Sequence, residues 1–507
     1  MTMEMAPERE NSRNIVLFPF MAQGHIIPFI ALAHQLLKTQ NYSTITFITT
    51  KLNIPKISSS LPPNNNNNII RVLEIPFRGS DHGLPPGVEN TDVLPYHLIP
   101  SFIEASFSLK PHFRDLISDL IVSGGPLHQP LCIIADMFFG WSHEIAREFG
   151  VFHALFCGGN AYGFACFHSL WLNLPHKNKL CMTTTHDDEE DMITVPDFPE
   201  ASRIHVTQMS ENLREADGGA KFLVVIQKLL SEWKNADAML FNTVEELETL
   251  TGLLYFRRKL GRPVWPIGPV VLPAATKEGG IMTEMCTKWL DTQPAKSVLY
   301  VSFGSQNTIS ASQMMDLGMA LENCGKNFIW VVRPPIGFDI NEEFRAEEWL
   351  PSGFEERIRE SNRGLLVRKW APQVVILSHE SVSAFLSHCG WNSMVEALTQ
   401  GVPILGWPLA ADQFYNAKFL EEELGVCVEV ARGKSSRVCH EEMVKKIEMV
   451  MNVGTEKGSE IRRKTCEVRD IMKNALIYEN GYKGSSVKAM DELLKEASLM
   501  RQKNSLI

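Results

Sequence analysis

A group of hydrogen-bond donors around His388 has the residue types and spacing of a phosphate-binding site. The apolar run at residues 384–389 predicts a short buried strand, and Gly390 ends it. Asn392 and Ser393 follow as N-cap residues of a helix. A helix start presents unpaired N–H groups and the positive end of the helix dipole, which together favour a di-anionic phosphate without a metal ion. We therefore expect His388, Asn392 and Ser393 to donate hydrogen bonds to a phosphate.

A histidine and a carboxylate in the first half form a second candidate site. His25 follows the predicted strand at residues 14–20, in the sequence PFMAQGHIIP, and Asp136 ends the apolar run at residues 131–135. Ligands of parallel sheets bind at the carboxyl ends of the strands, so both side chains would face a ligand. Histidine accepts a proton near neutral pH, and a neighbouring carboxylate can orient it and stabilise its cation. The alternatives are that His25 caps a helix and that Asp136 only ends a strand.

The stretch from Trp370 to Gln413 resembles the signature box of the plant UDP-sugar-dependent glycosyltransferases that modify small molecules. It has the 44 positions of that box (413 − 370 + 1) and matches it at the opening WAPQ, the central HCGWNS, Glu396 and the closing Asp-Gln pair. The resemblance extends over nearly the whole chain from Asn14 and is weakest at residues 163–235. It implies a donor site made of Ser305, Trp370, Ala371, Gln373, His388, Trp391, Asn392, Ser393, Glu396, Asp412 and Gln413.

The same resemblance assigns a role to each part of the box. Trp370 would stack on uracil, and Gln373 and Glu396 would hold the ribose. His388, Asn392 and Ser393, with the turn at Ser305, would bind the diphosphate. Trp391, Asp412 and Gln413 would bind the sugar. Taken singly, these residues have plainer explanations, since a tryptophan can be a core aromatic, a histidine a buried hydrogen-bonded residue and an aspartate a helix cap.

His25 and Asp136 also match the catalytic histidine of that family and the carboxylate that orients it. The resemblance thus implies an inverting transferase that moves a sugar from a UDP-sugar to a hydroxyl of a small plant metabolite. We expect glucose, because Trp391 and Gln413 favour it, and a phenolic or flavonoid acceptor; another UDP-sugar, or a terpenoid or hormone acceptor, is the alternative. Cys157 stands near a place where many relatives carry a hydroxyl side chain, which leaves the sugar contacts of the first domain open.

Two other functions are compatible with parts of the sequence. A nicotinamide-dependent oxidoreductase would need GxGxxG after the first strand, where this chain has MAQGHI. A non-catalytic nucleotide-sugar binder would not need His25 and Asp136 together. The diphosphate site consists of donors rather than converging carboxylates, so we expect no metal and no cofactor beyond the UDP-sugar as co-substrate. The acidic cluster at residues 187–191 is interpreted as a solvated loop.

Strand and helix patterns alternate along both halves of the chain, which predicts an α/β protein with parallel doubly wound sheets. Two such Rossmann-like domains facing across a cleft are the GT-B fold that the resemblance implies. We predict an acceptor-binding domain at residues 1–268, a linker at 269–285 and a UDP-sugar-binding domain at 286–484. A final helix within 485–507 would return to the first domain.

Length, net charge and cysteine content indicate which partners and which compartment to expect. The chain has 507 residues, enough for two cores, and a net charge of −10, which argues against nucleic acid as a partner. The ten cysteines show no metal-ligand spacing and suit a reducing cytoplasm. Residues 15–37 are interrupted by polar residues, and residues 1–14 lack the basic end of a signal peptide, so we expect no integral membrane segment. A monomer acting on UDP-glucose and a small hydroxylated acceptor is the expectation.

Overall fold

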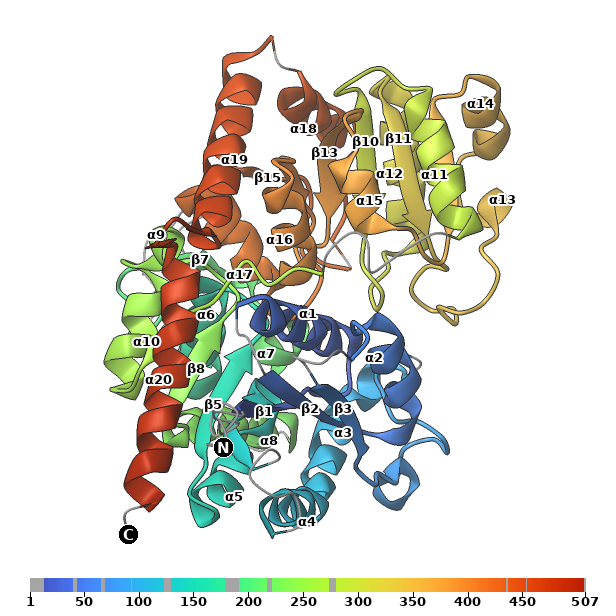
Figure 1. Ribbon diagram of the computed structural model, residues 1–507. Helices are drawn as coiled ribbons and strands as arrows, with labels where there is room; N and C mark the ends of the chain where they lie inside the picture. Colours follow the sequence, from blue (N-terminus) through green and yellow to red (C-terminus); the bar gives the residue numbers. More distant parts are fainter. Residues whose placement is uncertain are drawn as a thin grey trace, which may run out of the picture.

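The computed structural model describes residues 13–39, 43–64, 69–92, 94–122, 129–177, 191–216, 221–272, 280–434, 436–452 and 454–505. Within these residues the chain forms two α/β domains, drawn one above the other in Figure 1, with the amino-terminal domain below. Residues 1–12, 65–68 and 187–190, which include most of the asparagine and acidic runs, lie outside the described residues.

The first domain is built on a parallel sheet in the order β3-β2-β1-β4-β5-β8-β9. Its strands are β1 (Arg13–Phe18), β2 (Ser43–Thr49), β3 (Ile69–Glu74), β4 (Pro130–Asp136), β5 (Phe152–Cys157), β8 (Ala238–Phe241) and β9 (Val264–Pro266). The order reverses between β1 and β4, where Phe18 pairs with Ala135. A crevice forms at such a reversal, because the connections leave the two strands in opposite directions.

The second domain repeats this plan with a parallel sheet in the order β12-β11-β10-β13-β14-β15. Its strands are β10 (Val298–Ser302), β11 (Asn327–Val332), β12 (Gly364–Arg368), β13 (Val382–Ser387), β14 (Ile404–Gly406) and β15 (Cys427–Glu429). Here the order reverses between β10 and β13, which places the segments after these two strands together.

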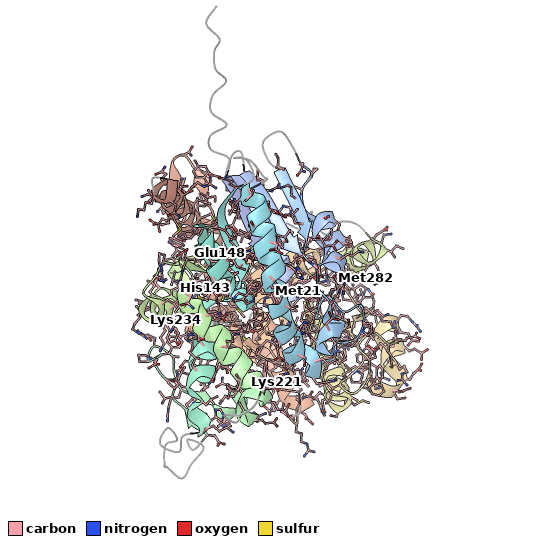
Figure 2. The ribbon with its side chains drawn as sticks, turned by 90° about the horizontal axis from the view of Figure 1, so that it is seen from below. Met21, His143, Glu148, Lys221, Lys234 and Met282 are labelled. Atoms are coloured by element: carbon pink, nitrogen blue, oxygen red, sulfur yellow. The ribbon has the colours of Figure 1, made fainter. Side chains whose placement is uncertain are left out.

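Helices cover both faces of the two sheets. The first domain has α1 (Gln23–Thr39), α2 (Ile54–Ser60), α3 (Ile99–Ala105), α4 (Leu109–Val122), α5 (Ser142–Glu148), α6 (Ala161–Asn173), α7 (Glu211–Glu215), α8 (Lys221–Glu232), α9 (Glu245–Glu248) and α10 (Gly252–Leu260). The second has α11 (Ile281–Asp291), α12 (Ala311–Asn323), α13 (Ala346–Trp349), α14 (Phe354–Glu360), α15 (Gln373–Ser378), α16 (Trp391–Thr399), α17 (Gln413–Lys418), α18 (His440–Met451) and α19 (Glu456–Ala475). Figure 2 shows α8, between the labels of Lys221 and Lys234, on the outer face of the first domain.

The last helix, α20 (Ser485–Ser505), lies along the first domain rather than the second (Figure 1). Met490, Leu493 and Leu494 are buried in the same core as Leu17 of β1. The indole nitrogen of Trp265 donates to the carboxylate of Glu492 at 3.0 Å, which fixes the helix to β9. The domain boundaries given above stay predictions.

Prolines shape two local features of the first domain, and a helix begins within the predicted linker. The helical segment at residues 96–122 is interrupted, because Pro100 and Pro111 lack an N–H group and each lies in the first turn of a new helix, α3 and α4. β9 extends the first sheet beyond β8, and its Pro266 is tolerated because an edge strand has one unpaired side. Helix α11 begins at Ile281, inside the predicted linker.

The N-cap positions expected in the phosphate segment are wrong. The N-cap of α16 is Gly390, and no side chain caps this helix. Asn392 and Ser393 therefore lie within the first turn instead of at the cap position. Their side chains are available for contacts outside the helix, and the N–H groups of the first turn stay open toward the cleft.

Candidate active site

His25 and Asp136 meet at the reversal of strand order in the first sheet. His25 lies in the first turn of α1, just after β1, and Asp136 is the last residue of the adjacent strand β4. Nδ1 of His25 is 2.8 Å from Oδ2 of Asp136. The other oxygen, Oδ1, accepts from the backbone N–H of Phe138 at 3.0 Å, so the carboxylate is held from both sides. These contacts fix the orientation of the histidine ring and leave Nε2 as the ring nitrogen that can contact a ligand.

The environment of His25 favours its protonated form. Burial lowers the pKa of His25, but the charge and hydrogen bond of Asp136, together with the charge of Asp412, outweigh burial and raise the pKa above the ordinary 6.5. The side chain of His25 is 26% exposed, whereas that of Asp136 is 1% exposed. Proton exchange therefore takes place at the histidine, and the buried carboxylate stabilises the cation that results.

One cavity of about 460 Å³ lies between the two domains and gathers the residues expected to bind the donor. His25 lines it from the first domain, and Asp136 lies behind His25. The expected donor residues that line it are Ser305, Trp370, Ala371, Gln373, His388, Trp391, Asn392, Ser393, Glu396, Asp412 and Gln413. The structure thus brings together side chains that are 388 positions apart in sequence, from 25 to 413.

At one end of the cavity, an exposed aromatic ring lies beside a hydrogen-bonded pair. Trp370 is 51% exposed, which is unusual for a tryptophan that forms part of a core. The side-chain amide of Gln373 donates to Oε2 of Glu396 at 2.7 Å and to the hydroxyl of Ser393 at 2.9 Å, and accepts from the hydroxyl of Tyr300. A flat stacking surface next to a fixed carboxylate and amide suits a nucleoside, with the base on Trp370 and the ribose hydroxyls at Glu396.

Two glycines hold His388 in place. A Cβ atom on Gly390 would lie 2.4 Å from Nε2 of His388, and one on Gly304 would lie 2.7 Å from the same atom, so the ring fits only because both residues lack a side chain. Burial, aided by the charge of Lys434, lowers the pKa of His388 to about 4. The ring is therefore neutral at physiological pH and offers a single N–H donor.

Two residues of the box make contacts that the sequence did not predict. The indole N–H of Trp391 donates to the backbone oxygen of Asn242 at 2.6 Å, and the side-chain amide of Asn392 donates to the backbone oxygen of Gly24 at 2.9 Å. Both acceptors belong to the first domain. These side-chain donors therefore connect the domains and leave the ring of Trp391 and the backbone N–H groups of α16 to face a ligand.

Asp412 is the N-cap of α17, and Gln413 is its first residue. The carboxylate of Asp412 accepts from the side-chain amide of Asn416 at 2.8 Å, and burial raises its pKa above the ordinary 3.8. Oε1 of Gln413 accepts from the backbone N–H groups of Leu409 and Ala410 at 3.0 and 2.9 Å. The amide nitrogen of Gln413 is thus the end of the side chain that is available to a ligand.

The first domain supplies an apolar arm of the same cavity. It is lined by Ile99, Ile103, Phe164, Phe167, Trp171 and Phe222, from α3, α6 and α8. Ser210 and Asn212, at the start of α7, contribute polar side chains to the lining. Among the described lining residues of this domain, His25 is the one that carries an ionisable side chain. The arm suits a largely apolar molecule that places one polar group at His25.

These observations agree with the comparisons to known proteins. The family described as UDP-glucoronosyl and UDP-glucosyl transferase matches residues 227–459. UDP-glycosyltransferase 92A1 of Arabidopsis thaliana is 47% identical over 506 residues, covering 99% of this chain and 100% of the relative. The chain belongs to the plant UDP-glycosyltransferases. Crocetin glucosyltransferase 3 of Crocus sativus is 41% identical and covers 88% of this chain and 92% of its own length.

Solved structures of plant UDP-glycosyltransferases share the fold. Glycyrrhiza uralensis UGT73P12, complexed with glycyrrhetinic acid 3-O-monoglucuronide, superposes with a TM-score of 0.78 at 28% identity, covering 98% of both chains. Phytolacca americana UGT2, complexed with UDP-2fluoro-glucose and pterostilbene, has a TM-score of 0.74 at 27% identity, covering 96% of this chain and 100% of that one. The predicted GT-B fold, two doubly wound domains across a cleft, is confirmed.

Several residues of this UDP-glycosyltransferase site were missed by the sequence reasoning. Phe164, Phe167 and Trp171 lie three and four positions apart on α6, a spacing that places them on one helix face and could have marked a lining surface. Cys157, which was considered for sugar contacts, is fully buried beside Met137 at 3.4 Å between the sulfur atoms, and Gly158 and Gly159 line the cavity instead.

Three further findings concern metal binding, membrane spans and cysteines in this UDP-glycosyltransferase. In the part of the chain that the structure describes, no group of three or more His, Cys, Asp or Glu side chains has the arrangement of a metal site. Across the same residues, no helix combines the length and hydropathy needed to cross a bilayer. The nine cysteines among the described residues are free thiols.

Proposed function

We propose that this UDP-glycosyltransferase moves glucose from UDP-glucose to a hydroxyl group of a small, largely apolar plant metabolite, with inversion at the anomeric carbon. The observation that carries the proposal is the His25–Asp136 pair: His25 lines the same cavity as the box residues expected to bind the donor, and Asp136 holds its ring from behind. A base that faces a nucleotide-sugar site from the opposite domain is the arrangement that direct displacement requires.

In the proposed reaction, Nε2 of His25 accepts the proton of the acceptor hydroxyl. The acceptor oxygen then attacks the anomeric carbon, and the bond between that carbon and the UDP oxygen breaks with both electrons passing to UDP. Asp136 stabilises the imidazolium through Nδ1. A single displacement from the side opposite the leaving group inverts the configuration. The proton is returned to water after product release.

Charge on the departing UDP is stabilised by donors of the second domain. We assign this role to the neutral N–H of His388, the hydroxyls of Ser305 and Ser393 and the open N–H groups at the start of α16. Trp370, Ala371, Gln373 and Glu396 would hold the uridine. The indole N–H of Trp391 and the side-chain amide of Asn392 donate to the first domain. Trp391 would therefore contact the donor sugar through the face of its ring, and Asn392 would contribute its backbone N–H. Asp412 and the amide nitrogen of Gln413 would bind sugar hydroxyls.

The acceptor class follows from the apolar arm and from the relatives. The arm is rich in aromatic side chains, and relatives are described as anthocyanin 3'-O-beta-glucosyltransferase of Gentiana triflora and scopoletin glucosyltransferase of Nicotiana tabacum. These names favour a phenolic or flavonoid acceptor. A terpenoid or hormone acceptor is the second candidate, favoured by the glycyrrhetinic acid derivative that fits a protein of the same fold.

The test is a reaction screen with purified protein. UDP-glucose, UDP-galactose and UDP-glucuronate are each combined with phenolic, terpenoid and hormone acceptors, and products are identified by mass spectrometry. We expect a mass increase of one hexose with UDP-glucose on at least one phenolic acceptor. Transfer from another donor in preference to UDP-glucose would contradict the donor assignment, and transfer to none of the three classes would contradict the acceptor assignment. The anomeric configuration of the product, read by NMR coupling constants, tests inversion.

A further inference from the structure

Arg333 is an arginine in the cavity whose hydrogen-bonding capacity is unused. It follows β11 and lines the cavity from the second domain. Its Nε is buried and has no hydrogen-bond partner among the described residues. Other arginines with a buried Nε use their terminal nitrogens, as Arg363 does toward the backbone oxygens of Leu321 and Glu322. A buried N–H of a guanidinium normally requires an acceptor.

Asp92 is the matching carboxylate on the first domain. Its Oδ2 lies 3.2 Å from Nζ of Lys56, whereas Oδ1 is buried and has no hydrogen-bond partner among the described residues. Burial lowers the pKa of Arg333, and the negative charge of Asp92 acts in the opposite direction. Arg333 lines the cavity from the second domain and Thr91, the residue before Asp92, lines it from the first, yet the two charges do not form an ion pair within 4 Å in this arrangement of the domains.

The loop that carries Asp92 already reaches both domains. The hydroxyl of Thr91 accepts from the side-chain amide of Gln306, which follows β10 in the second domain. The backbone N–H of Thr91 donates to the backbone oxygen of Met21 at 3.1 Å, in the segment that leads to His25. Met21 is labelled in Figure 2 at the first domain. The contacts of Thr91 with both domains therefore hold the next residue, Asp92, near the cleft.

Arg333 lies at the nucleoside end of the cavity. Val332, the preceding residue, accepts from the backbone N–H of Lys369 at 3.2 Å, and Lys369 precedes Trp370. Strands β11 and β12 pair in parallel, with Val332 opposite Arg368. Arg333 and Trp370 thus follow neighbouring strands and both line the cavity, and Thr91, the residue before Asp92, lines it from the first domain.

We propose that Asp92 and Arg333 form an ion pair across the cleft when the UDP-sugar is bound, which closes the two domains over the nucleoside. The proposal rests on the proposed function for the identity of the ligand. A bound nucleotide displaces water from the cleft, so the attraction between the two charges is stronger in the filled cavity than in the open one. A ligand stabilises the conformation to which it binds better, and both residues are positioning residues for the donor.

The test is a double-mutant cycle measured on UDP binding. Asp92→Asn and Arg333→Gln are each expected to raise the Kd of UDP in calorimetry, and the KM of UDP-glucose, by about tenfold, whereas kcat changes less than about threefold. The double variant Asp92→Asn/Arg333→Gln is expected to match either single variant, because the second change removes a partner that is already lost. The reversed pair Asp92→Arg/Arg333→Asp is expected to restore part of the affinity.

The control for these variants is an arginine outside the cavity. Arg368→Gln removes an exposed arginine that pairs with Glu355 outside the cavity, and it should leave the Kd of UDP unchanged. Effects of the two single changes that add in the double variant would overturn the ion pair. A loss confined to Arg333→Gln would also overturn it and would mean that the guanidinium contacts the nucleotide directly. Because UDP binding needs no acceptor or sugar, a failure of the glucose or acceptor assignment would leave this measurement intact.

Discussion

Nδ1 of His25 and Oδ2 of Asp136 are 2.8 Å apart, although 111 positions separate the two residues in sequence. They meet because β1 and β4 are neighbours at the point where the order of the first sheet reverses. The carboxylate has its second oxygen on the N–H of Phe138, so it cannot rotate away from the ring. Such a pair fixes the tautomer of the histidine and leaves Nε2 to act on a ligand in the cavity.

The first prediction concerns the base. His25→Ala should lower kcat about 100- to 10,000-fold, the usual contribution of a general base, because no group remains to accept the proton of the acceptor. The Kd of UDP should stay within about twofold, because the nucleotide site belongs to the other domain. Steady-state kinetics and calorimetry measure the two quantities.

His34→Ala is the matched control for this change. His34 lies on the same helix, α1, and its Nε2 contacts the backbone oxygen of Ser60 at 2.9 Å, away from the cavity. The His34→Ala variant should retain the turnover of the native enzyme. Near-normal turnover of His25→Ala on an acceptor that the native enzyme uses would remove His25 from the mechanism.

A second prediction uses pH. Asp136→Asn replaces the acceptor at Nδ1 by an amide that can donate, so Nε2 of His25 would carry the proton and could not accept one. We expect kcat to fall about 100-fold. In the native enzyme kcat/KM should rise with pH through the pKa of His25, above 6.5, because only the neutral ring is a base. Without Asp136 this pKa falls, so the acidic limb of the profile should move to lower pH.

A pH–rate profile of both proteins tests this directly. If Asp136→Asn reduces turnover while the acidic limb stays where it was, the residue supports the structure of the site without acting through His25. Circular dichroism melting of the variant separates a general loss of folding from the loss of this pair.

The third prediction concerns the space around His388. In Gly390→Ala the new Cβ would lie 2.4 Å from Nε2 of His388, so the ring must move and its N–H can no longer face the diphosphate. The loss of one hydrogen bond to a charged group, about 1.5–3 kcal/mol, corresponds to an increase of about 10- to 150-fold in the KM of UDP-glucose. Kinetics with varied donor at saturating acceptor measure it.

Gly280→Ala is the control for adding a methyl group to a helix-capping glycine. Gly280 is the N-cap of α11, and its Cβ position has nothing within 4 Å. This variant should leave the donor KM unchanged. An equal donor KM for Gly390→Ala and the native enzyme would mean that His388 does not bind the diphosphate.

The positions that the sequence predicted best are those that depend on the end of a single strand. His25 and His388 come shortly after a strand and Asp136 is the last residue of one, and the parallel alternation of strands and helices brings such ends to one edge. The contacts of Trp391 and Asn392 with the first domain could not be predicted, because they depend on how the two domains are oriented and no local pattern encodes that. The breaks at Pro100 and Pro111 could have been predicted from the prolines alone.

A fourth prediction concerns the choice of donor sugar. Gln413→His should weaken the use of UDP-glucose relative to UDP-galactose, because the amide nitrogen that faces the cavity is lost. Gln413→Glu separates the two ends of the side chain. Its oxygens can still accept from the N–H groups of Leu409 and Ala410, but it has no donor for the sugar. We expect both variants to lose preference for UDP-glucose, and only the histidine variant to lose thermal stability. Competition between the two donors in one reaction gives the ratio, and a native ratio in Gln413→Glu would place sugar selection on other residues.

The last prediction is that transfer needs no divalent metal. A metal-dependent transferase holds its ion with carboxylates that converge on the diphosphate. The cavity carboxylates here have other partners: Glu396 accepts from Gln373, and Asp412 accepts from Asn416. The groups assigned to the diphosphate are donors, namely His388, Ser305, Ser393 and the start of α16. A helix start contributes about 0.3–2 kcal/mol toward an anion and each charge-assisted hydrogen bond about 1.5–3 kcal/mol, so several together can stabilise departing UDP as an ion would. Turnover should therefore be the same in excess EDTA and with added magnesium or manganese. Complete loss in EDTA that either metal restores would show that the diphosphate site includes an ion, and the donor groups would then have to be reassigned.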